Sequence, residues 1–389
     1  MRCDQTLMVR CLPGFHVIVV TNDERQATDG LLPGGDTPNP SAPQTRWATT
    51  VTGPVAAHAL GHVASHEHLL TDLRPRTPTG ELAPVPADHT TDPITLDTYY
   101  EIRRDDLNMN NLVLDSEDDA LAELAAFKAA GGSTLVDLTL PCVGRDPEAL
   151  RRLSERSGVK IVMGCGWYEH EFHGDEPHRL SVVEMTDVLI AEIVEGVEGI
   201  RAGVIGEIGL GWPVRDCEAG VLRAAVAAQL ATGAPLNIHP GRHPLAAFDV
   251  VSRVREMGGD LSRMVLSHVE RTLFTVAEIA EVARTGVTVS FDLFGQESAH
   301  YAHADIDMPN DAGRVAMIRQ LIELGLSDRI VISQDICVKV HMRRWGGEGY
   351  AHLLEHVLPL MRRRGIAEDD ITAMTRTNPA RLLGIVAPR

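Results

Sequence analysis

Apolar and polar residues follow two different periods over most of the chain. Short apolar runs such as "STLVDLTL" and "VKIVMGCGWY" are typical of buried strands. Longer segments between them, such as "SVVEMTDVLIAEIVEGVEG" and "HPLAAFDVVSRVREMG", carry apolar residues at helical spacing. This succession predicts βαβ units and a parallel sheet.

The number of apolar runs indicates how the sheet is closed. We expect strands at about residues 63–68, 133–139, 159–166, 203–208, 234–239, 263–268, 286–292 and 329–335. Eight βα units in one chain favour an α/β fold of the (β/α)8 TIM barrel type. An open doubly wound sheet is the alternative, but no G-x-G-x-x-G follows the first run, so a dinucleotide-binding fold has no support.

The start of the chain has a different composition. The stretch "ATDGLLPGGDTPNPSAPQT" is dense in Gly, Pro, Ser and Thr, which favours a loosely attached segment. We therefore expect a flexible N-terminal extension over residues 1–46 and a single barrel domain over residues 47–389.

Composition and charge narrow the choice of partner. The chain of 389 residues is 44% hydrophobic, enough for a large core, and its net charge of −18 argues against nucleic acid or an anionic membrane. No apolar run reaches about 18 residues, so no membrane span is expected. The six cysteines lack CxxC spacing, which predicts reduced thiols and a cytoplasmic protein.

Polar side chains stand at the ends of five expected strands. They are His66 and His68 after the first strand, Glu207 after the fourth, His239 after the fifth, His268 after the sixth and Asp335 after the eighth. Side chains alternate along a strand, so the two histidines of "SHEHLL" share one face and Glu67 between them faces the other. All strand C-termini meet at one rim of a parallel barrel, where active sites are built. The pattern therefore predicts a metal site at that rim.

Each of these residues also has a simpler interpretation. A single histidine after a strand is more often a hydrogen-bonded residue than a ligand, "GEIG" is compatible with a turn, and "SQD" with a helix cap. The coincidence of six such residues at one rim favours metal binding. Nitrogen and oxygen donors suit zinc, manganese, cobalt or iron better than copper(I) or an iron–sulfur cluster.

Several motifs in combination carry a family resemblance. With "HEH", "GEIG", "IHPGRH", "SHVERT", "SQDI" and "GGEGY", the sequence from "TTVTGPV" to "NPARLLG" resembles phosphotriesterase-related proteins of the amidohydrolase superfamily. The resemblance implies a (β/α)8 barrel that holds two divalent metal ions. It also implies the ligand roles: one metal on His66, His68 and Asp335, the other on His239 and His268, and Glu207 with a hydroxide as bridges.

The bridge departs from the pattern of the phosphotriesterases proper, which use a carboxylated lysine. Only three lysines occur, at Lys128, Lys160 and Lys339, and none is expected at the end of the fourth strand. Glu207 carries the same charge as a carboxylated lysine and likewise has two oxygens, one for each metal. The chain therefore resembles a glutamate-bridged branch, for which an organophosphate substrate is less expected.

The chemistry expected of such a site is hydrolysis, because a water between two divalent cations becomes a nucleophile near neutral pH. Asp335 is the candidate catalytic residue that takes the proton and passes it to the leaving group. The seventh strand, "VTVSFDLFG", lacks the histidine that relays this proton in the triesterases. Asp292, Glu270 or direct release to solvent are the alternatives.

Substrate contacts are expected from loops at the same rim. The candidates are Tyr168 and Arg242, together with Lys339, His341 and Arg344 in the loop "CVKVHMRRWGGEGY". Packing on the barrel top is the alternative for Tyr168, and pairing with a loop acid is the alternative for Arg242. Cationic residues above the metals predict a substrate with a carboxylate, phosphate or sulfonate group.

Three functions remain open at this point. The first is a dinuclear hydrolase of a carboxylic ester, a lactone or an N-acyl amide bond, with a metal-bridging hydroxide as nucleophile. The second is a phosphotriester hydrolase, and the third is an inactive metal-binding scaffold, which the intact ligand set disfavours. We expect a small-molecule substrate, two divalent metal ions with zinc as first choice, and a homodimer.

Overall fold

The computed structural model describes residues 46–105 and 107–387. The predicted N-terminal extension lies outside the described residues except for Arg46, so that expectation stays a prediction. The described part begins with a hairpin of β1 (Trp47–Thr50) and β2 (Gly53–Ala56).

Eight parallel strands then form a nearly closed barrel in the part of the chain that the structure describes. They are β3 (Val63–Glu67), β6 (Thr134–Asp137), β7 (Lys160–Cys165), β8 (Val204–Gly209), β9 (Leu236–His239), β10 (Met264–Leu266), β11 (Thr288–Phe291) and β12 (Ile330–Ile332). Their order in the sheet is β12-β11-β10-β9-β8-β7-β6-β3, which is also their order in the chain. The predicted (β/α)8 barrel is confirmed.

Some strands end earlier than the apolar pattern predicts. β3 ends at Glu67, β10 at Leu266 and β12 at Ile332, so His68, His268 and Asp335 follow their strands. His268 and Asp335 have φ of 52° and 51°. A residue in this left-handed region cannot continue a strand, so neither β10 nor β12 extends to these two residues.

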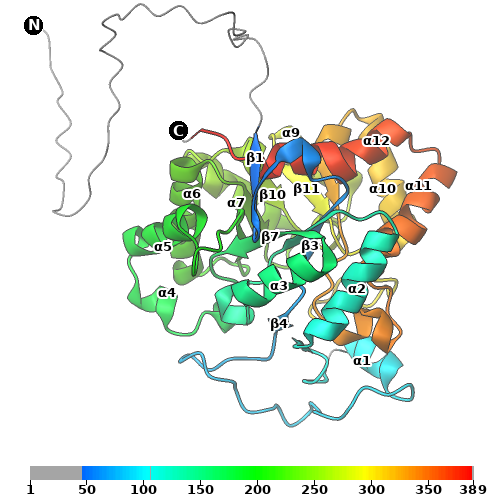
Figure 1. Ribbon diagram of the computed structural model, residues 1–389, viewed down its shortest axis with the longest axis horizontal. Helices are drawn as coiled ribbons and strands as arrows, with labels where there is room; N and C mark the ends of the chain where they lie inside the picture. The colour runs from blue at the N-terminus through cyan, green and yellow to red at the C-terminus, as the bar shows by residue number, and fades with distance from the viewer. Residues whose placement is uncertain (1–45, 106, 388–389) are drawn as a thin grey trace, which may run out of the picture. The chain divides into compact units, whose positions relative to one another are not determined.

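Helices surround the strands (Figure 1). The longer ones are α2 (Glu117–Ala129), α3 (Pro147–Ser157), α5 (Val182–Val194), α6 (Asp216–Thr232), α7 (Pro244–Glu256), α9 (Val276–Arg284) and α10 (Asp311–Glu323). The shorter ones are α1 (Tyr99–Asp105), α4 (Glu176–Arg179), α8 (Val269–Thr272), α11 (Leu358–Arg363), α12 (Glu368–Thr372) and α13 (Asn378–Leu383). No helix in the described ranges combines the length and the apolar character that a membrane crossing requires.

Successive side chains of the strands pack on opposite sides of the sheet. On β6, Leu135 belongs to the same apolar cluster as Phe127 of α2. The next residue, Val136, belongs instead to a cluster with Val63 and Val162 of the neighbouring strands. The period of two therefore divides the core into a barrel interior and a layer between strands and helices.

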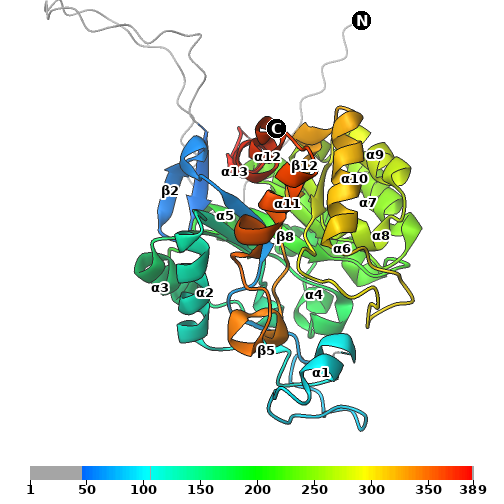
Figure 2. The same cartoon turned by 90° about the vertical axis from the view of Figure 1, so that its right-hand side faces the viewer.

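The C-terminal rim of the barrel is covered by two segments distant in sequence. In both views the segment around α1 and the turns after β12 lie at the end of the barrel away from the C-terminus of the chain (Figures 1 and 2). Ile102, Met109 and Val340 pack in one apolar cluster, and Tyr99 donates a hydrogen bond to Gly346 O (3.1 Å). The loop after Asp335 is therefore held as a cover over the rim.

Glu67 joins the first and last strands of the barrel. Its Oε1 accepts hydrogen bonds from the Ser333 hydroxyl (2.8 Å) and the Gln334 N–H (3.0 Å), and its Oε2 accepts one from the Ile336 N–H (2.9 Å). The fully buried carboxylate thus replaces ladder hydrogen bonds where β3 meets β12. This placement agrees with the prediction that Glu67 faces away from His66 and His68.

We predict that Glu67→Gln lowers the free energy of unfolding by about 1–3 kcal/mol, because the amide nitrogen cannot accept a hydrogen bond and leaves a buried N–H donor unpaired. Urea unfolding followed by circular dichroism measures the change. Glu81→Gln, at an exposed position, is the matched control. Equal stability of the Glu67→Gln variant and the wild type would contradict the proposed closure of the barrel.

Candidate metal centre

The six predicted ligand residues lie together at the C-terminal rim. Two triads share Glu207: one is His66, His68 and Glu207, and the other is Glu207, His239 and His268. In each triad the potential ligand atoms lie within 4.8 Å of one another. The geometry therefore matches two adjacent cation positions with Glu207 between them.

Glu207 lies on β8 and contacts both halves of the cluster. Its Oε1 is 3.0 Å from His239 Nδ1 and 2.8 Å from His268 Nε2, and its Oε2 is 3.5 Å from His66 Nε2. Gly206 before it has φ of 117°, and a Cβ there would lie 2.1 Å from Asn237 O. Only glycine allows β8 and β9 to approach this closely.

His66 and His68 present their Nε2 atoms to the cluster. The Nδ1 of His66 is 3.0 Å from Asp292 Oδ2, and the Nδ1 of His68 is 3.0 Å from Thr139 Oγ1. Such partners orient an imidazole so that its other nitrogen is free for a metal. The Nε2 of His66 is buried and has no hydrogen-bond partner, which is the condition expected of a metal ligand.

His239 and His268 form the other side of the cluster. The Nδ1 of His268 is 2.8 Å from Asp292 Oδ1, so its Nε2 points to Glu207. His239 directs its Nδ1 to Glu207, and its Nε2 lies 2.7 Å from Arg271 Nη2. Both imidazoles are buried and are oriented by groups behind them.

Asp335 lies on the His66–His68 side. Its Oδ1 is 3.2 Å from His68 Nε2 and 3.5 Å from His66 Nε2, and its N–H donates to His66 O (3.1 Å). Burial raises the pKa of Asp335, but the adjacent imidazoles outweigh burial and lower its pKa to about 2. The positive φ of Asp335 and His268 is strain of the kind that accumulates at functional sites.

The charges in the cluster favour bound cations. Burial raises the pKa of Glu207, but the three neighbouring imidazoles outweigh burial and hold its pKa well below the usual range. Burial lowers the pKa of His268, but Asp292 and Glu207 outweigh burial and raise that pKa to about 9. Ionised carboxylates this deeply buried need positive charge close by, and divalent cations can supply it in place of imidazolium protons. The residues present therefore fit a dinuclear metal centre.

Asp292 has a structural position that the sequence did not reveal. It follows β11 and accepts hydrogen bonds from the Nδ1 atoms of both His66 and His268, so it orients two histidines at once. Glu270 instead accepts from the Leu293 N–H (3.0 Å) and pairs with Arg314 (3.3 Å). The proposed relay of a proton through either acid stays a prediction.

The predicted substrate contacts fall at different distances from the cluster. The Tyr168 hydroxyl is 3.2 Å from His239 Nδ1, directly at the cluster. Arg242 pairs with Glu169 (2.8 Å) and donates a hydrogen bond to the Tyr301 hydroxyl (3.1 Å). The Oε1 of Glu169 in turn is 3.7 Å from His239 Nε2. Burial, followed by the charges of Glu207 and Glu169, raises the pKa of Tyr168 well above its usual value, so the hydroxyl keeps its proton.

The three candidates in the cover loop make contacts of their own. Lys339 donates to Asn110 Oδ1 (2.6 Å), and the exposed Arg344 pairs with Asp119 at the start of α2. Burial lowers the pKa of His341 to about 4, so this imidazole is neutral near pH 7. The contacts of Lys339 and Arg344 fasten the loop, and a role of these residues in substrate binding stays a prediction.

Comparisons with known proteins agree with the fold and the cluster. The model of the phosphotriesterase family matches residues 47–383. The N-acetyltaurine hydrolase of Homo sapiens is 39% identical over 343 residues, which cover 86% of this chain and 97% of that protein. The resiniferatoxin-binding protein of Rhodobacter sphaeroides has a known structure with a TM-score of 0.79 and 36% identity, covering 87% of this chain and 94% of that one.

A nearly closed parallel barrel with histidines and carboxylates gathered at its C-terminal rim defines a metal-dependent hydrolase. The chain belongs to the phosphotriesterase family. This family is a dinuclear metal-dependent family, and the described residues include clusters that can hold metal ions. The resemblance inferred from the motifs is confirmed.

Proposed function

We propose that this chain hydrolyses the N-acyl amide bond of a small anionic compound, and that N-acetyltaurine is the first substrate to test. The observation that carries the proposal is the double triad centred on Glu207, which presents side chains from separate strands to one small volume. The relatives named N-acetyltaurine hydrolase support the choice of bond and substrate, since they match 86% of this chain.

The proposed ligands are those of the two triads together with Asp335. His66, His68 and Asp335 would hold one ion, His239 and His268 the other, and Glu207 both. Two divalent cations bound there would lower the pKa of a water molecule and polarise the amide carbonyl. Zinc is the proposed metal, because neutral imidazole and carboxylate donors suit its preferences.

Two side chains of the chain itself have proposed roles beside the ligands. Asp335 is the proton acceptor, because it is ionised and stands next to His68 (3.2 Å) at the cluster. It passes the proton to the departing amine nitrogen. Tyr168 keeps its hydroxyl proton at the other side, beside His239 (3.2 Å). It donates a hydrogen bond to the carbonyl oxygen, where negative charge develops during attack.

Arg242 is proposed to bind the anionic group of the substrate. It is partly exposed and is linked to the cluster through Glu169, which contacts both Arg242 and His239. A sulfonate or carboxylate presents two coplanar oxygens to the guanidinium fork. An acyl group at the cluster and an anion at Arg242 then place the amide bond between them.

We predict that Arg242→Gln raises KM for N-acetyltaurine about tenfold or more, because a charge-assisted hydrogen bond to the anion is lost. The rate with N-ethylacetamide, which lacks the sulfonate, is expected to change little. Steady-state kinetics with both compounds measure the difference, and Arg253→Gln on α7 is the matched control. An equal loss with both compounds would show that Arg242 does not recognise the anion.

A substrate panel tests the proposed function itself. Metal-loaded protein is assayed in parallel with N-acetyltaurine, N-acetyl-β-alanine, a γ-lactone and a dialkyl aryl phosphate. The expected result is the highest kcat/KM for one of the two anionic amides. A higher kcat/KM for the lactone or the phosphate would overturn the proposal and favour a lactonase or a phosphotriesterase.

The assembly and location that we propose are a homodimer in the cytoplasm. The described cysteines, Cys142, Cys165, Cys217 and Cys337, are all free thiols, in agreement with a reducing compartment. Sedimentation of the purified protein tests the dimer.

A further inference from the structure

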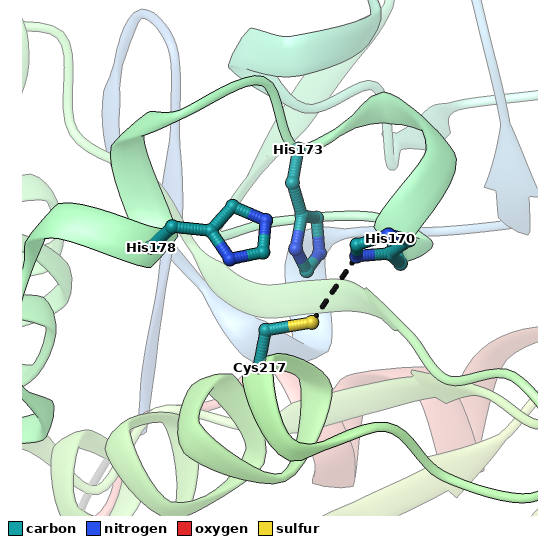
Figure 3. Close-up of side chains that lie close together, drawn as sticks. All are labelled: His170, His173, His178 and Cys217. Carbon is teal, nitrogen blue, oxygen red and sulfur yellow. Dashed lines mark hydrogen bonds between the residues drawn. The ribbon is translucent and has the colours of Figure 1, made fainter. Parts of the chain in front are cut away.

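A second group of potential ligands lies outside the catalytic cluster. His170 begins the 3-10 turn His170–Phe172, His173 follows this turn, His178 lies on α4, and Cys217 lies in the first turn of α6. Their potential ligand atoms all lie within 4.8 Å of one another. Figure 3 shows the three imidazoles side by side above the Cys217 sulfur, with His178 at the left, His173 in the middle and His170 at the right.

The potential ligand side chains of this group also contact one another. His170 Nδ1 is 3.2 Å from Cys217 Sγ. The ring of His178 lies 5.4 Å from the ring of His170 and 6.2 Å from the ring of His173, centroid to centroid. Three imidazoles in mutual contact with a thiol do not form a hydrophobic core. Their nitrogen and sulfur atoms offer more lone pairs than the N–H and S–H groups of the same side chains can bind by hydrogen bonds.

His173 supplies an independent indication of a ligand. Its Nε2 donates a hydrogen bond to Tyr168 O (2.6 Å), so its Nδ1 carries a lone pair instead of a proton. That Nδ1 is buried without any hydrogen-bond partner, in a residue that is only 4% exposed. A histidine that donates to a backbone carbonyl and presents its other nitrogen to an otherwise unpartnered space has the arrangement of a metal-bound imidazole.

We propose that His170, His173, His178 and Cys217 form a second metal site, which binds one Zn²⁺ ion. Three imidazole nitrogens and one thiolate complete a tetrahedron without an open position, as in structural zinc sites. Neighbouring ligand atoms of a tetrahedral zinc ion lie about 3.3–3.8 Å apart at usual bond lengths. The present spacings of the four ligand atoms, all within 4.8 Å, are close to this range. His178 is exposed, so the ion has a route from solvent.

The position of this site gives the ion a structural role. The first three ligands belong to the segment between β7 and α5, and the fourth belongs to α6, so an ion would fasten that segment to the barrel wall. The segment carries Tyr168, whose carbonyl is held by His173 and whose hydroxyl lies at the catalytic cluster. The second site is therefore expected to fix Tyr168 without contacting the substrate.

Cobalt substitution tests the proposal on the full-length protein. Cys217 is the only sulfur in either metal centre, so a thiolate-to-cobalt charge-transfer band in the near ultraviolet reports on this site alone. The wild type with excess Co²⁺ is expected to show the band, and Cys217→Ser is expected to lose it together with one metal equivalent. His178→Ala, at an exposed position, is expected to lose the same equivalent. Cys142→Ser, at a thiol outside the group, is the matched control and is expected to keep both.

The outcomes separate this site from the proposed catalytic function. Absence of the band in the wild type, or its persistence in Cys217→Ser, would overturn the second site. Metal content that is equal in the wild type and in His178→Ala would do so as well, even if Cys217→Ser failed to fold. None of these results depends on which substrate the catalytic centre hydrolyses.

Discussion

Glu207→Gln is expected to lower kcat by about 10²–10³-fold, because the substitution removes the negative charge that, in the proposed centre, would screen two adjacent cations from each other. Metal content of the catalytic centre is expected to fall at the same time. The amide keeps the shape of the side chain, so the fold, which is built from barrel packing, is expected to survive. Steady-state kinetics and elemental analysis of the same preparation measure both effects.

Glu123→Gln is the matched control for this variant. Glu123 is also a buried carboxylate, but it accepts hydrogen bonds from the backbone N–H groups of Arg343 and Tyr350 instead of contacting the histidines of the cluster. The metal content and kcat of the Glu123→Gln variant are expected to stay near the wild-type values. Glu207→Lys adds a second test, because added bicarbonate is expected to restore part of its activity through a lysine carbamate. Full metal content and normal turnover in Glu207→Gln would contradict a bridging role.

Asp335→Asn is expected to lower kcat by about 10²–10⁴-fold, since the amide cannot accept the proton that the leaving group requires. The amide oxygen still faces His68, so KM for the substrate is expected to change much less than kcat. Steady-state kinetics separate the two constants. Asp328→Asn, at an exposed position in the turn before β12, is the control. Wild-type kcat in a fully metal-loaded Asp335→Asn protein would contradict the catalytic role of Asp335.

The sequence was most informative where one physical rule decides the structure. The alternation of apolar runs and amphipathic segments predicted the barrel, because strands buried on both faces leave a continuous apolar run. The polarity of parallel strands then placed residues as distant in sequence as His66 and Asp335 at one rim. In the structure their side chains lie 3.5 Å apart.

Other features depend on distances between strands that no local pattern encodes. Asp292 contacts His66 and His268 together only because β3, β10 and β11 approach one another in the nearly closed barrel. The left-handed backbone at His268 and Asp335 is likewise fixed by tertiary contacts, since neither residue type requires a positive φ. Sequence reasoning therefore placed the ligand candidates at the rim but not the groups that orient them.

The second histidine group, His170, His173, His178 and Cys217, was not predicted from the sequence. Three histidines lie within nine residues in "HEFHGDEPH", which is a detectable signal. The fourth candidate ligand, Cys217, lies on a helix after the next strand, and only the packing of α4 against α6 brings it close. The acids that pair with the cationic cover loop, such as Asp119 beside Arg344, are equally remote in sequence.

The most direct measurement of the central claim is anomalous diffraction at the zinc absorption edge from crystals of zinc-loaded protein. We expect two peaks within the catalytic cluster, one on each side of Glu207, with His66 and His68 beside one peak and His239 and His268 beside the other. They are distinct from the peak expected at His170, His173, His178 and Cys217. A single peak within the catalytic cluster, or two peaks there that Glu207 does not contact, would contradict a glutamate-bridged dinuclear centre.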